Sequence, residues 1–526
     1  MVGRWLRVAV WWATAATAAW GGCAEPGPTY FPVAPLAEER LADGRVSRLY
    51  DLSGDGSADY SEVLSAEGRV ALLRYDVNGD GTFEEEVARR TAGAAARDNR
   101  HLVLILDSVP FAMVDVMWRQ GRFRLFAPPS RVISPFPVMT DLSLAEFFGT
   151  SPSPAVESMY YDGHALQGGY LNYAAEGNAG WNANTSYHLI HFIHSVAYLQ
   201  PRTWFEHELG KIQRFFYATD DNPYVGYVVT TSGLGAHFGR DGHQPALVKL
   251  DRFCQSVMHA MRGRVEITLM SDHGHNLLPS RRIPLSELLG AMGYRVADRL
   301  EGPQDVVVPE FGVVTCAAVY TRSAASVARD LAGVDGIDLT MHREGEAVMV
   351  RSRRGVARVW RGTGGYGYAC EEGDPLELRA ILDGLRADGA ERADGTFDDR
   401  VLFEATKGHR YPDALQRVWR PFDGLMTYTP DVLVSVEDGW HAGSALQTEL
   451  VDISSTHGSL NAASSLGFVM STAGSVPEYV RMEDLRRELR ALGVPFEVAE
   501  PERAAPGTPR SMAEPMKSSG SNQPGV

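Results

Sequence analysis

The chain has 526 residues, of which 44% are hydrophobic and 22% are charged, as is typical of a soluble globular protein with several folded parts. The formal net charge of −16 argues against a nucleic acid polymer as partner, because a phosphate backbone selects basic surfaces. Four cysteines in so long a chain exclude a disulfide scaffold, although an oxidising compartment would allow Cys316 and Cys370 to pair.

The first residues resemble an export signal. Arg4 and Arg7 precede an apolar run over Val8–Ala19 that is too short to span a bilayer. Gly21-Gly22-Cys23 resembles the cleavage box of bacterial lipoproteins, in which the cysteine carries the lipid, although Trp20 stands where an aliphatic residue is usual. We expect an exported protein of the bacterial cell envelope, held at the membrane by a lipid on Cys23. Simple secretion and a retained anchor are the alternatives.

Two related acidic segments follow a Pro-rich spacer. The first carries oxygen-bearing side chains at the ligand positions of a calcium loop, with a glycine for the sharp turn: Asp51, Ser53, Asp55, Ser57, Asp59 and the closing Glu62. The second repeats only the start of the pattern, with Asp76, Asn78 and Asp80, and has Val87 where the closing glutamate would stand. The flanks, 46–50 and 70–75, are expected to be strands. We expect a structural calcium-loop-like segment; the alternative is a pair of Asp-Gly turns without an ion.

Two apolar strands end at residues that can bind a metal. Leu102–Leu106 is followed by Asp107, and Glu266–Met270 is followed by Ser271-Asp272-His273-Gly274. Continuous apolar runs are typical of parallel strands that are buried on both faces. Because ligand groups gather beyond the carboxyl ends of such strands, the pattern predicts a metal site. The alternative for Asp107 is a cap on the helix that follows.

Thr140 follows a Pro-rich extended approach over 132–139 and precedes a helical pattern. At a helix start, free backbone N–H groups and the helix dipole favour an anion. The Thr140 hydroxyl is therefore either an N-cap or a nucleophile directed at a phosphate.

These segments together resemble the alkaline phosphatase superfamily, most closely its type I phosphodiesterase/nucleotide pyrophosphatase branch. Asp107 matches the metal-binding Asp of that family, and Phe136-Pro137-Val138-Met139-Thr140 matches the turn that presents its nucleophile. Asp272-His273 and Thr456-His457-Gly458 match two later metal-binding motifs. The resemblance runs from about His101 to Gly474. It implies a mostly parallel α/β sheet flanked by helices, with a small inserted α+β lobe.

The resemblance also implies two divalent metal ions, of which Zn²⁺ suits carboxylate and imidazole ligands best. The first would be bound by Asp107, Thr140, Asp272 and His273. The second would be bound by His237, His457 and a carboxylate one helical turn before His237, but that position is Gly233. Ser232, Asp241 and His243 are possible substitutes, none of them at the family spacing. Ser143 stands where the family often has an Asn that binds the phosphoryl oxygen.

The segments between the motifs are expected to shape the substrate site. Arg281 and Arg282 are candidates for binding a phosphate, or they lie in a solvated loop. His188, His191 and His194 follow helical spacing, and we interpret them as histidines of an aromatic helix rather than as metal ligands. Asp431–Val436 is expected to return the chain to the main sheet.

The chain is expected to divide into consecutive segments around this core. They are a signal peptide (1–23), a linker (24–45), the calcium-loop-like segment (46–95), the core in two parts (98–290 and 401–475), an inserted lobe between these parts (291–400), a C-terminal helix (476–500) and a disordered tail (501–526).

We expect a hydrolase of phosphoesters, with a diester favoured over a monoester and a phosphorylated small molecule or lipid headgroup as substrate. The rival hypothesis is a catalytically degraded relative that keeps the fold and one metal and serves as a binding or scaffold protein; the missing carboxylate at Gly233 favours it.

Overall fold

The structure is a computed structural model that describes residues 26–89, 99–175, 180–450 and 452–497. The predicted signal peptide, with Cys23, and the predicted tail over 501–526 lie outside these residues. All helices and strands described below belong to one compact unit that ends at Phe496. Within the described ranges, no helix has the length and apolar character needed to cross a membrane.

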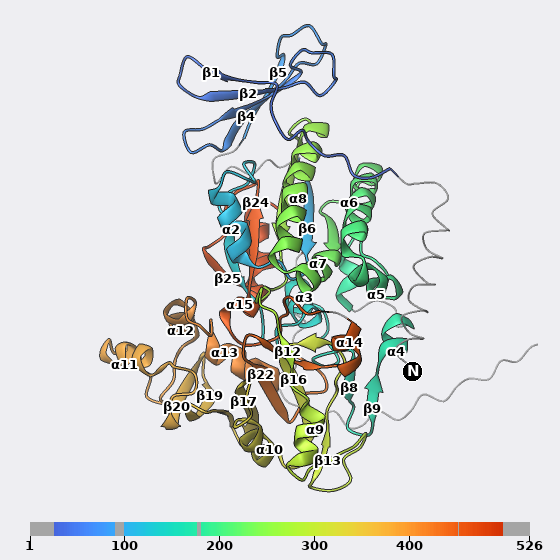
Figure 1. Ribbon diagram of the computed structural model, residues 1–526. Helices are drawn as coiled ribbons and strands as arrows, with labels where there is room; N and C mark the ends of the chain where they lie inside the picture. Colours follow the sequence, from blue (N-terminus) through green and yellow to red (C-terminus); the bar gives the residue numbers. More distant parts are fainter. Residues whose placement is uncertain (1–25, 90–98, 176–179, 451, 498–526) are drawn as a thin grey trace, which may run out of the picture. The chain divides into compact units, whose positions relative to one another are not determined.

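A six-stranded sheet forms the centre of the predicted core (Figure 1). Its strands, in spatial order, are β10 (Tyr224–Val228), β6 (Arg100–Leu106), β11 (Val265–Met270), β24 (Leu466–Ser471), β7 (Ser130–Ile133) and β25 (Tyr479–Arg481). Within this sheet β24 runs against the other five strands, so the sheet is mostly parallel, as expected. Leu104 of β6 is level with Gly226 of β10 and with Leu269 of β11, which aligns the carboxyl ends of these three strands.

Strand β6 is buried on both faces. Successive side chains of a strand point to opposite sides, so the strand packs against two layers. Leu102, Leu104 and Leu106 pack with α2 (Phe111–Arg119), α6 (Pro201–Ala218) and α8 (Arg240–Ala260). Val103 and Ile105 pack on the opposite side with α3 (Thr140–Phe148) and α16 (Met482–Ala491). The continuous apolar run that predicted a doubly buried strand is confirmed.

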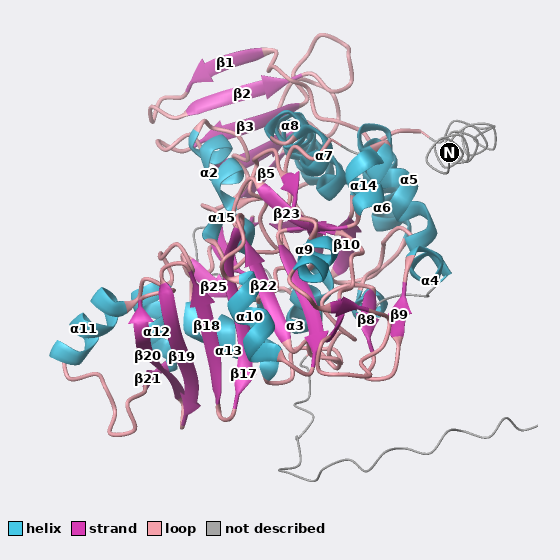
Figure 2. Cartoon of the chain, turned by 60° about the horizontal axis from the view of Figure 1, so that its bottom comes forward, coloured by secondary structure: helices cyan, strands magenta, loops and turns pink. Residues whose placement is uncertain are grey.

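A nine-stranded sheet forms most of the predicted lobe. Its strands, in spatial order, are β13 (Arg295–Val296), β14 (Asp305–Val307), β16 (Cys316–Thr321), β22 (Val432–Val436), β17 (Ile337–Glu344), β18 (Ala347–Ser352), β19 (Gly355–Gly362), β20 (Gly365–Gly373) and β21 (Phe397–Asp398). In Figure 2, α11 (Arg379–Ala387) and α12 (Asp399–Thr406) lie beside β20 and β21. One face packs on α9 (Leu285–Ala291) and α10 (Ala324–Leu331), and the other packs on α13 (Ala414–Trp419).

The expectation that Asp431–Val436 returns the chain to the main sheet is wrong. This segment is β22, which pairs antiparallel with β16 and β17, so that Val434 lies opposite Ala317 and Thr340. An apolar run shows that a strand is buried on both faces, but both large sheets bury their central strands in this way. The chain returns to the central sheet only at β24.

The acidic N-terminal segment lies in an antiparallel five-stranded sheet. Its strands follow the chain order: β1 (Ala37–Arg40), β2 (Val46–Tyr50), β3 (Tyr60–Leu64), β4 (Val70–Tyr75) and β5 (Glu85–Ala88). The predicted strands 46–50 and 70–75 are confirmed, whereas part of the predicted linker forms β1. Tyr50, Tyr60 and Leu73 share a hydrophobic cluster with Val257 and Met258 of α8.

Short elements connect these sheets. They are β8 (Met159–Tyr161), β9 (Leu166–Gly168), α4 (Tyr170–Ala175), η1 (Gly180–Asn184), α5 (His191–Leu199), α7 (Thr230–Phe238), β12 (Arg281–Arg282), β15 (Val313–Val314), η2 (Arg420–Phe422), β23 (Trp440–Gly443), α14 (Ala445–Leu450) and α15 (Ala462–Ser465). Cys316 and Cys370 are both free thiols, so the disulfide that an oxidising compartment would allow does not form in this structure.

Candidate metal centre

The ends of β6 and β11 bring Asp107 and Asp272 together. Because the two strands are parallel neighbours, the turns that follow them lie side by side. The Ser108 backbone N–H donates to Oδ1 of Asp272 at 3.0 Å, and the Val109 N–H donates to Oγ of Ser271 at 2.9 Å. Asp107 does not cap α2, whose N-cap residue is Pro110 and receives no side-chain hydrogen bond. The cap interpretation of Asp107 is therefore wrong.

Thr140 faces the same point from a third direction. It is the first residue of α3, and the N-cap residue is Met139, so the Thr140 hydroxyl is not the N-cap. Oγ1 of Thr140 instead lies 3.3 Å from Nε2 of His273. The Ser134 hydroxyl donates to the Asp272 carbonyl oxygen and ties the extended approach to the turn after β11.

Three side chains at this point form a group that fits a divalent cation. Nε2 of His273 lies 3.3 Å from Oδ2 of Asp272 and 3.9 Å from Oδ1 of Asp107. All three ligand atoms lie within 4.8 Å of one another, and all three residues are buried. Two ionised carboxylates that are buried next to each other repel and are poorly solvated, so a cation between them would stabilise the group. The donor set is one that Zn²⁺ and Mn²⁺ accept.

Neighbouring groups orient these ligand atoms. Nδ1 of His273 lies 3.0 Å from the Gly274 carbonyl oxygen and donates to it in the neutral ring, which leaves the lone pair on Nε2 toward the carboxylates. Asp107 accepts from the Ser108 hydroxyl and from the Tyr227 hydroxyl, each at 2.6 Å. Such outer hydrogen bonds fix ligand orientation in metal sites.

Burial sets the protonation of the group in the absence of an ion. It raises the pKa of Asp272 to about 7, and it raises the pKa of Asp107 well above its usual range, with the Asp272 charge acting in the same direction. Burial lowers the pKa of His273 to about 4, so the imidazole is neutral. A bound cation favours the ionised carboxylates and the neutral imidazole that ligation requires.

Helix α3 adds groups that suit an anion. Its first-turn N–H groups have no partner within the helix and lie beside the Thr140 hydroxyl. Ser143 lies one turn later, with its hydroxyl buried and without a hydrogen-bond partner among the described residues. Asp141, in the same turn as Thr140, accepts from Nε1 of Trp181 at 2.8 Å.

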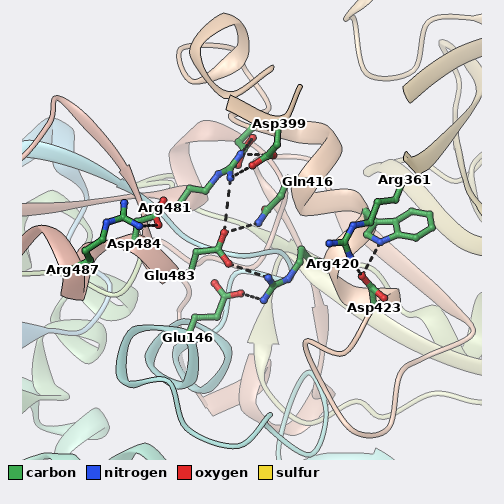
Figure 3. Close-up of polar contacts among 12 residues, drawn as sticks. Glu146, Arg361, Asp399, Gln416, Arg420, Asp423, Arg481, Glu483, Asp484 and Arg487 are labelled. Atoms are coloured by element: carbon green, nitrogen blue, oxygen red, sulfur yellow. Dashed lines mark hydrogen bonds and ion pairs between the residues drawn. The ribbon is translucent and has the colours of Figure 1, made fainter. Parts of the chain in front are cut away.

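A charge network anchors α3 from its far end (Figure 3). Arg420 of η2 donates to Glu146 of α3 at 2.5 Å and to Glu483 of α16 at 2.9 Å. Arg481 continues the network with a bond of 2.6 Å to Asp399 and one of 2.7 Å to Asp413. The helix that presents Thr140 is thereby tied to other elements of the fold.

Among the described residues, His237, His457, Asp241 and His243 do not form a group of three ligand atoms within 4.8 Å of one another. His237 lies in the last turn of α7, 5.4 Å from the Tyr198 ring. Asp241 is exposed on the first turn of α8 and joins no group of three ligand atoms among the described residues, so its role as a substitute ligand stays a prediction. The Ser232 hydroxyl lies 3.3 Å from the Ser108 hydroxyl. His457 does approach the first group, since its ring stacks on that of His273 with centroids 4.0 Å apart.

His275 is a residue of this region that the sequence did not single out as a ligand. Its ring lies 5.5 Å from that of His457 and 5.7 Å from that of His243. Burial lowers the pKa of His275 well below its usual range, and it lowers the pKa of His243 to about 4. The position of His275, directly after Asp272-His273-Gly274, could have identified it from the sequence, because a residue two positions beyond a ligand remains within the same turn.

Other predicted site residues lie away from this centre. Arg282 binds Glu310 at 3.0 Å and the Gly443 carbonyl at 2.8 Å, and Arg281 lies over the Trp440 ring. Both guanidinium groups thus have partners other than Asp107, Asp272 and His273. His194 uses both ring nitrogens, with the Tyr173 hydroxyl and the Leu189 carbonyl oxygen as partners, as expected for a histidine that is not a metal ligand.

The acidic loops bind mainly their own backbone. Asp51 accepts from the N–H groups of Gly54 and Gly56, and Asp76 does the same for Gly79 and Gly81. The remaining expected ligands bond within their own loops: Ser53, Asp55, Ser57 and Asp59 in the first, Asn78 and Asp80 in the second.

The predicted closing residue of the first loop is turned elsewhere, because Glu62 is buried on β3 and forms an ion pair of 3.3 Å with Arg124. In the second loop, Asp76, Asp80 and Glu84 bring three carboxylates within 4.8 Å of one another. Glu84 is thus a third carboxylate of the second loop, at a different position from the missing closing glutamate at Val87.

No protein-family model and no curated protein sequence matches the chain. Among solved structures, human ectonucleotide pyrophosphatase/phosphodiesterase 5 is similar at 13% identity and a TM-score of 0.40, covering 76% of this chain and 96% of that one. The murine protein is similar at 13% identity and 0.39, over 75% and 95%. Phosphonoacetate hydrolase from Sinorhizobium meliloti, in complex with phosphonoacetate, is similar at 10% identity and 0.37, over 76% and 96%. With TM-scores this low, the interpretation of the site rests on its own geometry.

Proposed function

We propose that this protein is a metal-dependent phosphoester hydrolase in which Thr140 is the nucleophile, with a diester favoured as substrate. One observation carries the proposal: the Thr140 hydroxyl, at the start of α3, faces the buried Asp107, Asp272 and His273. A hydroxyl, a cation-binding group and free helix N–H groups at one point are the parts that transfer of a phosphoryl group needs.

Asp107, Asp272 and His273 would hold a divalent ion, for which Zn²⁺ is the proposed identity. When bound, the ion lowers the pKa of the Thr140 hydroxyl and offsets negative charge on the phosphoryl oxygens. The chain supplies the rest of the site. The first turn of α3 binds a phosphoryl oxygen through its N–H groups, and the Ser143 hydroxyl lies one turn further along the same helix.

The proposed reaction has two steps. In the first, the Thr140 hydroxyl releases its proton to solvent and its oxygen forms a bond to phosphorus, while the ester bond breaks and the leaving alkoxide takes up a proton from solvent to become the alcohol. In the second, water attacks phosphorus, the bond to Thr140 breaks and the hydroxyl regains a proton. The resemblance to the type I phosphodiesterase branch supports this scheme and a phosphorylated small molecule or lipid headgroup as substrate.

The test compares hydrolysis of p-nitrophenyl diesters and monoesters of phosphate by the purified, Zn²⁺-loaded protein and its variants. Thr140→Ala and Asp272→Asn should each lower kcat/KM at least about a thousandfold. Thr150→Ala is the matched control, because its hydroxyl lies just beyond the other end of α3 and has no partner among the described residues. Wild-type rates in Thr140→Ala would refute the proposal.

A binding or scaffold protein is the second candidate, because the residues expected to bind a second ion do not assemble among the described residues. That function predicts a bound ion and phosphate affinity without turnover. Phosphate binding that persists in a protein inactive on every ester would favour it.

We also propose export and lipid anchoring at Cys23, on the basis of the sequence over 4–23. Extraction of the wild-type protein with membranes, and its loss from that fraction in Cys23→Ser, would support this. Equal distribution of the two proteins would contradict it.

A further inference from the structure

Gly233 marks the place where the family resemblance would put a carboxylate ligand of a second ion, and the space around this position is tight. A Cβ atom at Gly233 would lie 3.1 Å from both the Tyr198 carbonyl oxygen and the Cβ of Pro201. These atoms belong to the junction of α5 and α6, which packs across α7. A side chain here would require these neighbours to shift by a few tenths of an ångström, so the close packing of α7 on this junction favours glycine at position 233.

The neighbouring candidate ligands do not complete a second group of three. His237 packs against the ring of Tyr198, at the same junction, and its Nε2 is buried without a hydrogen-bond partner among the described residues. His243 is fully buried and uses Nε2 for a contact of 2.9 Å with the Thr231 carbonyl oxygen. Among the residues that the structure describes, the central sheet presents one group of three potential ligands within 4.8 Å, which is Asp107, Asp272 and His273.

A row of imidazoles lies beside the Asp107 group. His457 stacks on His273, His275 follows with a centroid distance of 5.5 Å from His457, and His243 follows at 5.7 Å from His275. Nδ1 of His457 lies 2.8 Å from the Val138 carbonyl oxygen, just before Thr140 in the chain. The row is therefore held by the same backbone that positions the proposed nucleophile.

The row depends on a glycine. A Cβ atom at Gly235 would lie 2.3 Å from Nδ1 of His275 and 2.5 Å from Cε1 of His243, closer than real contacts allow. Helix α7 can therefore approach the two rings only because residue 235 has no side chain. Nδ1 of each of these two histidines is buried without a hydrogen-bond partner among the described residues, so both rings keep a polar atom available.

We infer that the centre binds a single divalent ion at Asp107, Asp272 and His273, and that the row His457–His275–His243 replaces a second ion. This inference rests on the proposed function and sharpens it. A substrate oxygen on the His457 side of the centre would then meet the partly exposed ring of His457, which the buried rings of His275 and His243 support, in place of a second Lewis acid.

The experiment measures ions bound per chain. The purified protein is stripped with a chelator, titrated with Zn²⁺ alone by calorimetry, and the bound metal is confirmed by mass spectrometry after dialysis. We expect one ion per chain in the wild type, in His275→Gln and in His457→Gln. We expect Asp272→Asn to weaken binding of this ion at least roughly a hundredfold. His441→Gln is the control, since both ring nitrogens of this buried histidine are bonded to Ser280 and Thr448.

Two results would overturn the inference in different ways. Two ions in the wild type, with one lost in His275→Gln or His457→Gln, would mean that the imidazoles form a second cation site, and the proposed function would stand. No bound ion in the wild type would remove both the inference and the metal-dependent function. The count is also made in protein carrying Asp76→Asn and Asp80→Asn, so that an ion bound by the acidic loop is not counted. In that protein two ions overturn the inference and one ion supports it, so the test survives if a histidine variant fails to fold.

Discussion

The Tyr227 hydroxyl donates a hydrogen bond of 2.6 Å to Oδ2 of Asp107, across the parallel pair of β10 and β6. Tyr227 is buried, and its hydroxyl is bonded to Asp107. The contact fixes the orientation of a carboxylate that lies at the end of its strand. Strand pairing thus determines not only where Asp107 lies but also which of its oxygens faces His273.

Tyr227→Phe should weaken metal binding while leaving the fold intact. Loss of a hydrogen bond to a ligating carboxylate typically costs about 10–100-fold in metal affinity. The affinity is measured by competition with a chromophoric chelator. Tyr224→Phe on the same strand is the control, because its hydroxyl is buried without a partner among the described residues and its removal should leave affinity unchanged. Equal affinities of the two variants would contradict the role assigned to Tyr227.

Arg420→Met should destabilise the protein and lower turnover through α3. The change leaves Glu146 and Glu483 without their shared cation, for which we expect a loss of roughly 1–3 kcal/mol in the free energy of unfolding. The measurement is urea unfolding, together with kcat. Arg487→Met is the control in the same region, since Arg487 is 67% exposed and its pairs should contribute less than about 1 kcal/mol. Similar losses in both variants would argue against anchoring of α3 by Arg420.

Glu208 should make stability depend on pH. It accepts from the N–H groups of Val229 and Thr230 at the start of α7, and burial raises its pKa to about 8. Because the folded pKa lies above the unfolded one, the stabilising contribution of the protonated carboxyl is complete below about pH 4.5 and is lost as pH rises through about 8. The difference in unfolding free energy between wild type and Glu208→Gln should therefore shift against the wild type over this window. A difference that does not change with pH would contradict the shifted pKa.

Gly235→Ala should disturb the row of imidazoles. Its added methyl group would overlap His275 and His243, and we expect a cost of about 1–3 kcal/mol in stability with altered histidine NMR signals. Gly290→Ala, in α9, is the control because a Cβ there meets nothing within 4 Å. That change should be neutral or slightly stabilising. A Gly235→Ala protein as stable as the wild type would show that α7 does not pack as described.

The local pattern of the sequence was sufficient to locate the first group of ligands. Asp107 and Asp272 follow apolar strands, and Thr140 follows an extended approach to a helix, so each was identifiable from its own neighbours. Burial on both faces indicated interior strands, whereas the parallel pairing and register of β6 and β11 are seen in the structure. The structure brings these residues together as the sequence predicted, whereas their metal binding and catalysis stay predictions.

The remaining features depend on contacts between distant segments. Nothing near Gly233 indicates that the junction of α5 and α6, which lies well before it in the chain, fills the space above it. The ion pair of Glu62 with Arg124 and the pairing of β22 in the nine-stranded sheet are likewise long-range choices. His275 lies in the turn after β11, but its neighbour His243 lies on helix α8, so the row could not be inferred from spacing.

The most direct test of the account is to find where the phosphoryl group goes. The Zn²⁺-loaded protein is mixed with a p-nitrophenyl phosphodiester, quenched in acid within the first turnovers, digested and examined by mass spectrometry. We predict a phosphoryl group on Thr140, still carrying one ester substituent, and none in Thr140→Ala. Modification of a different residue, or undiminished hydrolysis by Thr140→Ala, would contradict the assignment of Thr140 as the nucleophile.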